Sequence, residues 1–570
     1  MFDTRNNPQR IRAHDGANAG CQVPLHRPRW LQTWTKAWLL ASGVFAVLWL
    51  LLRSGTRPSR LAYPCQQAAV GTAAAAFGAP LVAALLAARQ KVLAALRTPA
   101  GLAAAALGVI ATAGTWGYLS RADEYRGPVL DPPRDYRAKV FHVYDCPQDP
   151  VGDHFVGLDT LIALMGRGGL KFYESPSTST VAGPDGIIAA DDVVLIKVNY
   201  QWAERGGTNV DVLRGLIRRI VDHPDTFTGE IVVCENSQDY GMAYFDRDNN
   251  NAQDITLSPA DVVAGYQSQG HNVSTRIWRA LRNTLVDEYS EGDMTEGYVV
   301  YPYDDALQGA VSYPKFQTAS GTYISLRHGI WDPGTETYDR THLKFINVPV
   351  LKSHGAAYGA TACVKDYMGV VTVGLDTNSH ASVRYGLLGA LLGEIGLADL
   401  NILDCIWINA HPGGGPWTLY EDASRRDELV ASIDPVAADI WAVTNILIPG
   451  FIDNGYSPPW PWPSADPDDP SSTFRTYLDN SMNYILAAAY NVTNDLSQID
   501  VYSWNGAGDV DGDGDVDLAD FATFAMCYYG SGVTIPPPGC SADDFNSCDF
   551  DDDDDVDLND FATFAINFTG

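Results

Sequence analysis

The chain has 570 residues, 46% of them hydrophobic, which is enough for about two to four folded domains and excludes global disorder. Its net charge of −31 is unevenly spread: residues 1–126 hold 14 Lys and Arg against 4 Asp and Glu, whereas residues 507–570 hold 16 Asp and no Lys or Arg. Duplex nucleic acid requires a basic surface, so the acidic balance of the remaining chain excludes nucleic acid as a partner.

Residues 1–126 contain three apolar stretches, at about 34–52, 68–88 and 101–119. Each is long enough to cross the roughly 30 Å hydrocarbon core of a bilayer as a helix. A signal peptide is the alternative for the first stretch, and an Ala-rich soluble hairpin for the other two. Three such stretches in close succession favour three transmembrane helices.

The distribution of basic residues predicts the orientation of these helices. The tail up to Lys36 carries six Lys and Arg, and the loop after the first stretch carries three. Because basic segments stay in the cytoplasm, we expect a cytoplasmic N-terminus. Three crossings then place everything after residue 119 in the periplasm or outside the cell.

Residues 127–505 alternate strand-like and helix-like segments. A continuous apolar run at 192–199 predicts a buried strand, Thr208 is a plausible N-cap for a helix that ends near residue 222, and residues 230–234 predict the next strand. Residues 276–289 then read as a helix, whereas the insertion at 239–275 has no clean periodicity.

The second half of this region continues the alternation. Residues 345–351 and 400–408 predict strands, residues 381–397 predict a helix, and residues 434–447 predict another helix that Asp434 caps. Such alternation is typical of an α/β domain with a mostly parallel sheet and helices on both faces.

Polar and charged residues gather where the predicted strands end, which is where open α/β sheets hold ligands. Lysines in such places suit a small anionic ligand. Each residue also has a structural alternative as a surface lysine or a turn former, and the glycine-rich turn at 413–415 beside His411 either binds a ligand or is only a turn. The candidate catalytic residues are Lys197, Asn199, Glu235, Lys352, His354, Lys365 and Asp404.

Several of these residues lie in motifs that resemble the family called domain of unknown function 362, over roughly residues 190–445. The resemblance implies a domain and not a reaction. Many relatives also carry a ferredoxin-like cluster segment, but this chain has no Cys-x-x-Cys, so no iron–sulfur cluster is expected. The motifs are, in order, 195–199 with 207–209, 346–354 with 361–365 and Gly369, 402–404 with 413–416, and 432–439.

An acidic repeat ends the chain, with DVDL-x-DFATFA recurring at a period of 40 residues. Its acids have the spacing of the oxygen ligands in an EF-hand calcium loop, in which position 7 offers its backbone carbonyl. The predicted calcium ligands are Asp509, Asp511, Asp513, Asp515, Asp517 and Asp520 in the first copy, and Asp549, Asp551, Asp553, Asp555, Asp557 and Asp560 in the second.

Residues 506–570 therefore predict a small all-α calcium module and resemble a type I dockerin, because a single helix follows each loop. Gly514 occupies the sharp turn at position 6 of the first loop, and Asp554 replaces it in the second, which should be weaker or strained. The resemblance implies a cohesin-like partner, although Leu518-Ala519 and Leu558-Asn559 replace the usual Ser/Thr pair.

A disordered acidic tail is the alternative, but disorder does not require the repeated aromatic face of Phe521, Phe524, Phe561 and Phe564. Cys540 and Cys548 are close enough in sequence for a bridge in an oxidising compartment.

Together these features predict a membrane-anchored, exported protein. Its α/β domain binds or transforms a small anionic substrate, and its calcium module attaches it to a surface protein. The alternative is a non-catalytic surface scaffold that is recruited through the calcium module. The sequence leaves open whether the α/β domain is an enzyme.

Overall fold

The computed structural model describes residues 130–146, 154–239, 244–458, 463–511, 516–550 and 553–568. The three apolar stretches expected to span a membrane lie outside these residues.

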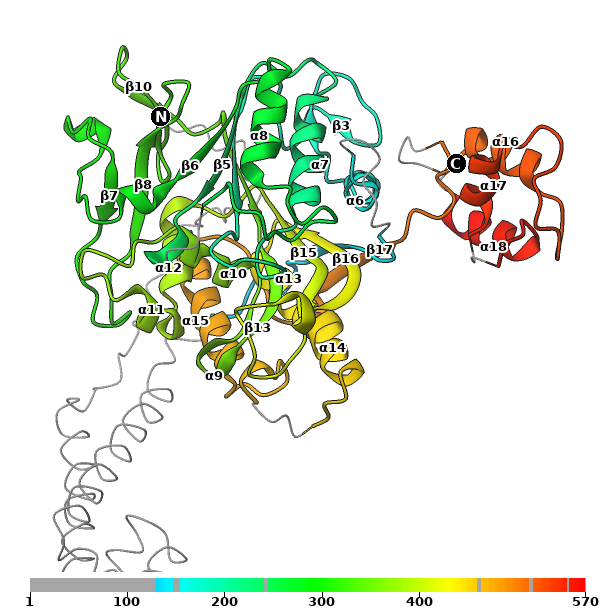
Figure 1. The fold of residues 1–570 in the computed structure, drawn as a ribbon. Helices are drawn as coiled ribbons and strands as arrows, with labels where there is room; N and C mark the ends of the chain where they lie inside the picture. Colours follow the sequence, from blue (N-terminus) through cyan, green and yellow to red (C-terminus); the bar gives the residue numbers. More distant parts are fainter. Residues whose placement is uncertain are drawn as a thin grey trace, which may run out of the picture. The chain divides into compact units, whose positions relative to one another are not determined.

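Within the described residues, ten strands form the main sheet (Figure 1). The path across it runs β17-β1-β16-β15-β12-β4-β5-β6, and β13 pairs with both β15 and β14. Only β16 and β14 run against their neighbours, so the sheet is mixed and mostly parallel. The strands are β1 (Ala138–Val143), β4 (Val193–Val198), β5 (Glu230–Glu235), β6 (Val273–Ile277), β12 (Leu343–Val348), β13 (Val350–His354), β14 (Gly359–Thr361), β15 (Leu400–Asn409), β16 (Ser424–Ser432) and β17 (Ile499–Trp504).

Hydrophobic cores lie on both faces of this sheet. Side chains alternate along a strand, so Val194 and Ile196 of β4 join one core, whereas Val193 and Leu195 join the other. The first core also contains α6 (Val156–Arg167), α7 (Val210–Val221) and α8 (Pro259–Ser268). The second contains α10 (Cys363–Asp366), α12 (Leu387–Ile395), α13 (Pro435–Ala442) and α15 (Thr473–Ala487). The predicted α/β class is confirmed.

The helix caps confirm one prediction and correct another. The Asp434 carboxylate caps α13 by accepting the N–H groups of Val436 and Ala437, both at 2.9 Å. The cap of α7 is Asn209 and not Thr208. Thr208 instead links two strands, because its hydroxyl accepts the Asn199 N–H at 2.8 Å and donates to the Val348 carbonyl at 2.6 Å.

One prediction for residues 239–289 is wrong, and the insertion at 239–275, which lacks clean periodicity, nevertheless forms regular structure. It contains α8 and the start of β6, and Ser258 begins α8 with a reciprocal capping box to Asp261. The predicted helix at 276–289 is instead the end of β6 followed by short 3₁₀ turns. Pairing of Arg276 and Ile277 with β5 overrides the local helical pattern.

The strand that follows residue 296 belongs to a second sheet. Among the described residues this sheet has five antiparallel strands in the order β11-β10-β9-β8-β7. They are β7 (Gly297–Val300), β8 (Ser312–Gln317), β9 (Tyr323–Ser325), β10 (Gly329–Asp332) and β11 (Thr337–Asp339). The sheet packs through Tyr298, Tyr313 and Phe316 on the core that contains α12.

The helical stretch Pro435–Asp453 is long and apolar enough to cross a membrane, on length and composition alone. In the described part of the chain it is the one stretch with this property, and 72% of its most apolar window is buried. It forms part of the core of the α/β domain.

Three helices form the described part of the C-terminal region: α16 (Leu518–Cys527), α17 (Ala542–Cys548) and α18 (Leu558–Asn567). The aromatic faces of the two repeats contact each other, with ring centroids 5.6 Å apart for Phe524 and Phe564. The expected partner of Cys540 is wrong, because Cys540 is bridged to Cys527 and Cys548 is a buried free thiol. Helix α17 brings Cys548 into the small core instead.

Candidate functional site

The main sheet changes direction between β4 and β12. From β4 the chain adds β5 and β6 on one side, and it then returns to place β12 and β15 on the other. Loops that leave the carboxyl ends of parallel strands at such a point diverge and leave a crevice for ligands. Lys197 lies near the end of β4 and Asn199 directly follows that strand, so both are at this crevice.

A hairpin brings the next candidate residues to the same place. The strand predicted at 345–351 is interrupted at Pro349, whose carbonyl accepts the Asp404 N–H at 2.8 Å. The chain resumes as β13, which pairs with β14 so that Lys352 lies opposite Thr361. His354 ends β13, and its Nδ1 is 2.5 Å from the Thr361 hydroxyl.

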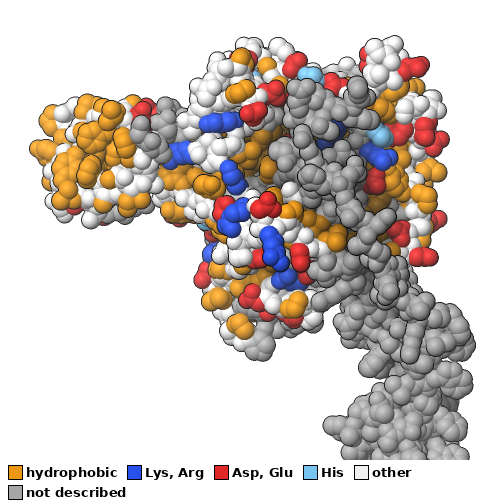
Figure 2. Space-filling model, turned by 180° about the vertical axis from the view of Figure 1, so that it is seen from behind, with side chains coloured by type: hydrophobic (Ala, Val, Ile, Leu, Met, Phe, Trp, Pro, Cys, Tyr) orange, Lys and Arg blue, Asp and Glu red, His pale blue; other side chains and the backbone are white. Residues whose placement is uncertain are grey.

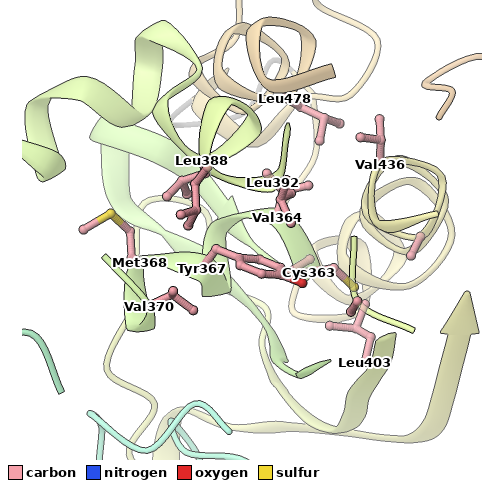
Figure 3. Close-up of a cluster of buried hydrophobic side chains, with 14 of the residues drawn as sticks. Cys363, Val364, Tyr367, Met368, Val370, Leu388, Leu392, Leu403, Val436 and Leu478 are labelled. Carbon is pink, nitrogen blue, oxygen red and sulfur yellow. The ribbon is translucent and has the colours of Figure 1, made fainter. Parts of the chain in front are cut away.

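Helix α10 has only four residues, and a carboxylate from another helix holds it. The two oxygens of Asp439 accept the N–H groups of Cys363 and Val364 at 2.6 and 3.1 Å, which satisfies donors at the start of α10. Figure 3 shows Cys363, Val364 and Tyr367 in a buried cluster with side chains of α12, α13 and α15. This packing fixes the position of Lys365.

These segments enclose a cavity of about 230 Å³. Six of the seven candidate catalytic residues line it, and Asp404 does not. The lining residues are Lys197, Asn199, Gln201, Trp202, Glu235, Gln238, Lys352, His354, Tyr358, Thr361, Lys365, Asp366, Gly369, His380 and Pro416.

Asp404 instead organises the start of α7. Its carboxylate accepts the N–H of Asn209 at 2.8 Å and the N–H of Ile406 at 3.0 Å. Burial raises the pKa of Asp404 to about 6 despite these hydrogen bonds. The residue lies inside β15 and not at its end, which explains why it does not reach the cavity.

Lys197 is the centre of a buried ion cluster. Its ammonium lies 2.5 Å from Asp366 and 3.2 Å from Glu235, and all three side chains are at most 3% exposed. Burial favours a neutral amine, but the two carboxylates outweigh it and raise the pKa of Lys197. Burial also raises the pKa of Glu235 to about 7. A Cβ at Gly369 would lie 2.5 Å from the Lys197 nitrogen, so only glycine fits there.

Among the described residues, no carboxylate pairs with the buried Lys352 or Lys365. The Lys352 ammonium donates to the Gly206 carbonyl at 2.5 Å. The Lys365 nitrogen lies 4.5 Å from the centre of the Tyr358 ring. Burial lowers the pKa of each lysine to about 7, even though Asp366 opposes the shift. Both lysines therefore exchange protons near neutral pH.

Two histidines contribute neutral rings to the cavity. Burial and the charges of Lys365 and Lys352 lower the pKa of His354 well below its usual value. Burial and Lys365 lower the pKa of His380 to about 4. At neutral pH each ring therefore has a nitrogen that can accept a proton or a hydrogen bond.

One side-chain amide of the cavity has a nitrogen without an acceptor in the part of the chain that the structure describes. Gln201 is 4% exposed, and its Nε2 has no hydrogen-bond acceptor among the described residues. A buried donor of this kind costs free energy unless a ligand or water accepts its hydrogen bond.

The turn at 413–415 packs closely against the backbone at the end of β13. A Cβ at Gly415 would lie 1.9 Å from the Ser353 carbonyl oxygen, and the Gly414 carbonyl accepts the Gly355 N–H at 2.8 Å. His411 contacts the Tyr456 hydroxyl at 3.2 Å and does not line the cavity. The glycines are therefore explained by close packing of the turn against β13, which supports a structural turn over a ligand-binding one.

Sequence reasoning missed four residues of the cavity that have clear roles. Asp366 and Gly369 follow Lys365 in the same motif, so their closeness in sequence to Lys365 could have identified them as site residues. Gln201 lies in a loop and His380 in the four-residue helix α11 (Ser379–Ser382), and neither segment has a recognisable pattern.

The acidic repeat places carboxylates close together in both copies. Among the described residues, carboxylate oxygens of Asp509, Asp511 and Asp520 lie within 4.8 Å of one another. In the second copy the corresponding group is Asp555, Asp557 and Asp560. Such groups of oxygen donors can hold a metal ion, and calcium prefers oxygen ligands.

The other predicted calcium ligands either lie outside these two carboxylate groups or are not among the described residues. Asp517 caps α16, and Asp549 accepts the Asp554 N–H at 2.9 Å. Asp553 is exposed, and Asp513, Asp515, Gly514 and Asp551 lie outside the described residues. Asp554 has φ of 66°, the left-handed conformation expected at position 6, which glycine adopts at lower cost.

A third group, Asp191, Asp192 and His342, lies at the opposite edge of the sheet, just before β4 and β12. Lys344 lies 3.8 Å from the Asp192 carboxylate, and His342 is hydrogen bonded to Asp339 at 2.6 Å. These contacts with Lys344 and Asp339 explain why the three side chains lie together without a metal ion.

The sequence of residues 341–444 matches a family described as a domain of unknown function, DUF362. This segment is a DUF362 domain. It spans β12, the β13–β14 hairpin, α10, α12, β15, β16 and α13, and so supplies Lys352, His354 and Lys365. The match is narrower than the predicted 190–445, and Lys197, Asn199 and Glu235 come from outside it. No curated protein and no solved structure matches the chain.

Proposed function

We propose that the α/β domain binds or transforms a small anionic substrate in the cavity at the switch point of the sheet. The observation that carries the proposal is the convergence of Lys197, Lys352 and Lys365 from separate segments onto one buried space. Asp366 and Glu235 both lie against Lys197, which leaves the other two lysines to meet the charge of a ligand.

The size and lining of the cavity support a metabolite as the ligand. Its volume of about 230 Å³ is below the ~300–1,000 Å³ of pockets that hold drug-sized ligands. Binding an anion there would raise the pKa of Lys352 and Lys365, because an opposite charge stabilises the ammonium form. Glu235 and His354 are then available to accept or return a proton.

Titration calorimetry with inorganic phosphate and succinate tests the proposal. We expect at least one of them to bind, and Lys352→Met or Lys365→Met to weaken that binding about tenfold or more, as loss of a charge-assisted hydrogen bond does. Lys315→Met is the matched control, because Lys315 of β8 in the second sheet is also fully buried but donates to the Asp293 carbonyl. Unchanged affinity in both cavity variants would contradict the proposal.

We further propose that the chain is an integral membrane protein with a cytoplasmic N-terminus and an exported α/β domain. The basic tail supports this orientation, and the Cys527–Cys540 disulfide supports an oxidising compartment for the C-terminal region. Protease added to cells with a permeabilised outer layer should remove the residues beyond about 120. Full protection of those residues would reverse the orientation.

We propose that the acidic repeats are a dockerin-like calcium module that attaches the protein to a cohesin-like or other surface protein. The carboxylate groups support calcium, and exposed apolar side chains at equivalent places of both repeats support docking, with Leu518 71% and Leu558 67% exposed. Figure 2 shows hydrophobic side chains gathered over this C-terminal region.

The same exposed side chains favour the alternative of a non-catalytic surface scaffold. One experiment distinguishes the anion-binding function from the scaffold function. In it, binding to a panel of cohesin domains and binding of anions are measured with the same protein. Leu518→Asp with Leu558→Asp should abolish calcium-dependent cohesin binding and leave anion binding intact. A protein that binds a cohesin and no anion would be a scaffold.

A further inference from the structure

The three lysines of the cavity differ in what holds their nitrogen atoms. Lys197 is fixed between two carboxylates, and Lys352 donates to the Gly206 carbonyl. Lys365 is 3% exposed, and among the described residues its nitrogen has no hydrogen-bond acceptor. Its close neighbour is the face of the Tyr358 ring. Lys365 is therefore the lysine whose nitrogen remains available to a ligand.

The neighbourhood of Lys365 disfavours an ammonium ion. Asp366 is next in sequence, but its carboxylate lies 2.5 Å from Lys197 and is engaged there. The positive charge of Lys197 and burial both act against a proton on Lys365. A desolvated lysine beside another cation is the arrangement that makes a lysine nucleophilic at neutral pH.

We propose that Lys365 forms an imine with the carbonyl carbon of a small oxo acid whose carboxylate is held by Lys352. This inference rests on the proposed function, since it assigns the anion to a chemical class. Lys352 suits the carboxylate because its ammonium is already a hydrogen-bond donor in the same cavity.

The step balances without an oxidant or reductant. The neutral amine of Lys365 attacks the carbonyl carbon, and a C–N bond forms while the carbonyl π bond opens. The two hydrogens of the amine end on the former carbonyl oxygen, which leaves as water, and the C=N bond remains. Glu235 and His354 line the cavity and can relay these protons.

Reductive trapping tests the inference on the full-length chain in detergent micelles. The protein is incubated with pyruvate and sodium borohydride, and the modified lysine is located by peptide mass spectrometry. We expect the reduced adduct on Lys365, its loss in Lys365→Arg, and about tenfold slower trapping in Lys352→Met, the loss expected when a charge-assisted hydrogen bond is removed. Lys315→Met, outside the cavity, should be trapped at the wild-type rate.

Circular dichroism of each variant establishes that it is folded. An adduct spread over surface lysines, or one that persists in Lys365→Arg, overturns the imine.

A parallel titration with phosphate and succinate, which form no imine, separates the two proposals. If these anions bind and pyruvate is not trapped on Lys365, the imine is wrong and the anion site stands. If no anion binds and nothing is trapped, both proposals fail.

Discussion

The cavity and the C-terminal repeats both gather charged side chains, but they hold them by different means. In the cavity, Lys197 lies between Glu235 and Asp366, and large hydrophobic cores on both faces of the sheet support all three. In the repeats, 16 Asp residues have no Lys or Arg among them, and the small core is built around Phe524, Cys527 and Phe545.

This difference between the cavity and the repeats indicates which of the two sites is already formed before its ligand binds. The cavity has opposite charges in place, so its geometry follows from the fold. The repeats have charges of one sign, and their mutual repulsion opposes compaction until a cation gathers the carboxylates. Calcium is therefore expected to be part of the folding of one region and irrelevant to the other.

The largest expected effect is the response to a chelator. Without calcium, α16 and α18 should lose their protection from hydrogen exchange, whereas β4 and β12 should keep theirs. Exchange measured by mass spectrometry on the whole chain, with calcium and with chelator, compares the two regions in one sample. Equal protection of α16 under both conditions would show that the repeats fold without the ion.

Replacing Lys365 tests the cost of burying a cation in the cavity. Its pKa is about 7 in the folded chain and about 10.5 in the unfolded one, so the unfolded state binds the proton more tightly. The penalty is fully present below pH 7 and disappears as the pH rises through 10.5. Lys365→Met should therefore unfold at higher urea concentration at pH 7, by up to about 4 kcal/mol in free energy, and gain little at pH 10.5. An equal gain at both pH values would contradict this pKa.

Adding a methyl group at Gly369 tests how tightly the ion cluster is packed. The new Cβ would lie 2.5 Å from the Lys197 nitrogen and 2.6 Å from a Glu235 oxygen, so the ion cluster must shift. Gly369→Ala should lower the free energy of unfolding by roughly 1–3 kcal/mol. Gly265→Ala in α8 is the control, since nothing lies within 4 Å there and the change should stabilise by about 0.5–1 kcal/mol.

The smallest expected effect ranks two predicted ligands of the first proposed calcium loop. Asp520 closes the first loop, because its carboxylate accepts the N–H groups of Val510 and Asp517 at 2.7 and 2.8 Å. Asp515 is at position 7, where only a backbone carbonyl is needed. Asp520→Ala should weaken calcium binding about tenfold more than Asp515→Ala, by calorimetry. The reverse order would contradict the assigned positions.

The alternation of strands and helices was predictable because apolar periodicity is local. The convergence of six candidate residues was predictable for a second reason, since parallel strands present their carboxyl ends at one edge. Asp404 was misjudged because its strand continues to Asn409, which turns its carboxylate toward Asn209.

What the sequence did not reveal depends on contacts between distant segments. Nothing local marks Asp366 as the partner of Lys197, 169 residues away, or Cys527 as the partner of Cys540 in preference to Cys548. The second sheet was missed because its strands β9 and β11 have only three residues each, too short for periodicity.

The Cys527–Cys540 disulfide affects when the repeats reach their full stability. It closes a segment of 13 residues between α16 and α17, and such a closure typically stabilises a fold by about 3 kcal/mol. A newly made chain in a reducing compartment lacks this contribution, so its apparent calcium affinity is lower there. If the repeats bind calcium and are exported as proposed, oxidation would act as a maturation step that raises this affinity, and the form proposed to dock would arise after the chain has left the place of its synthesis.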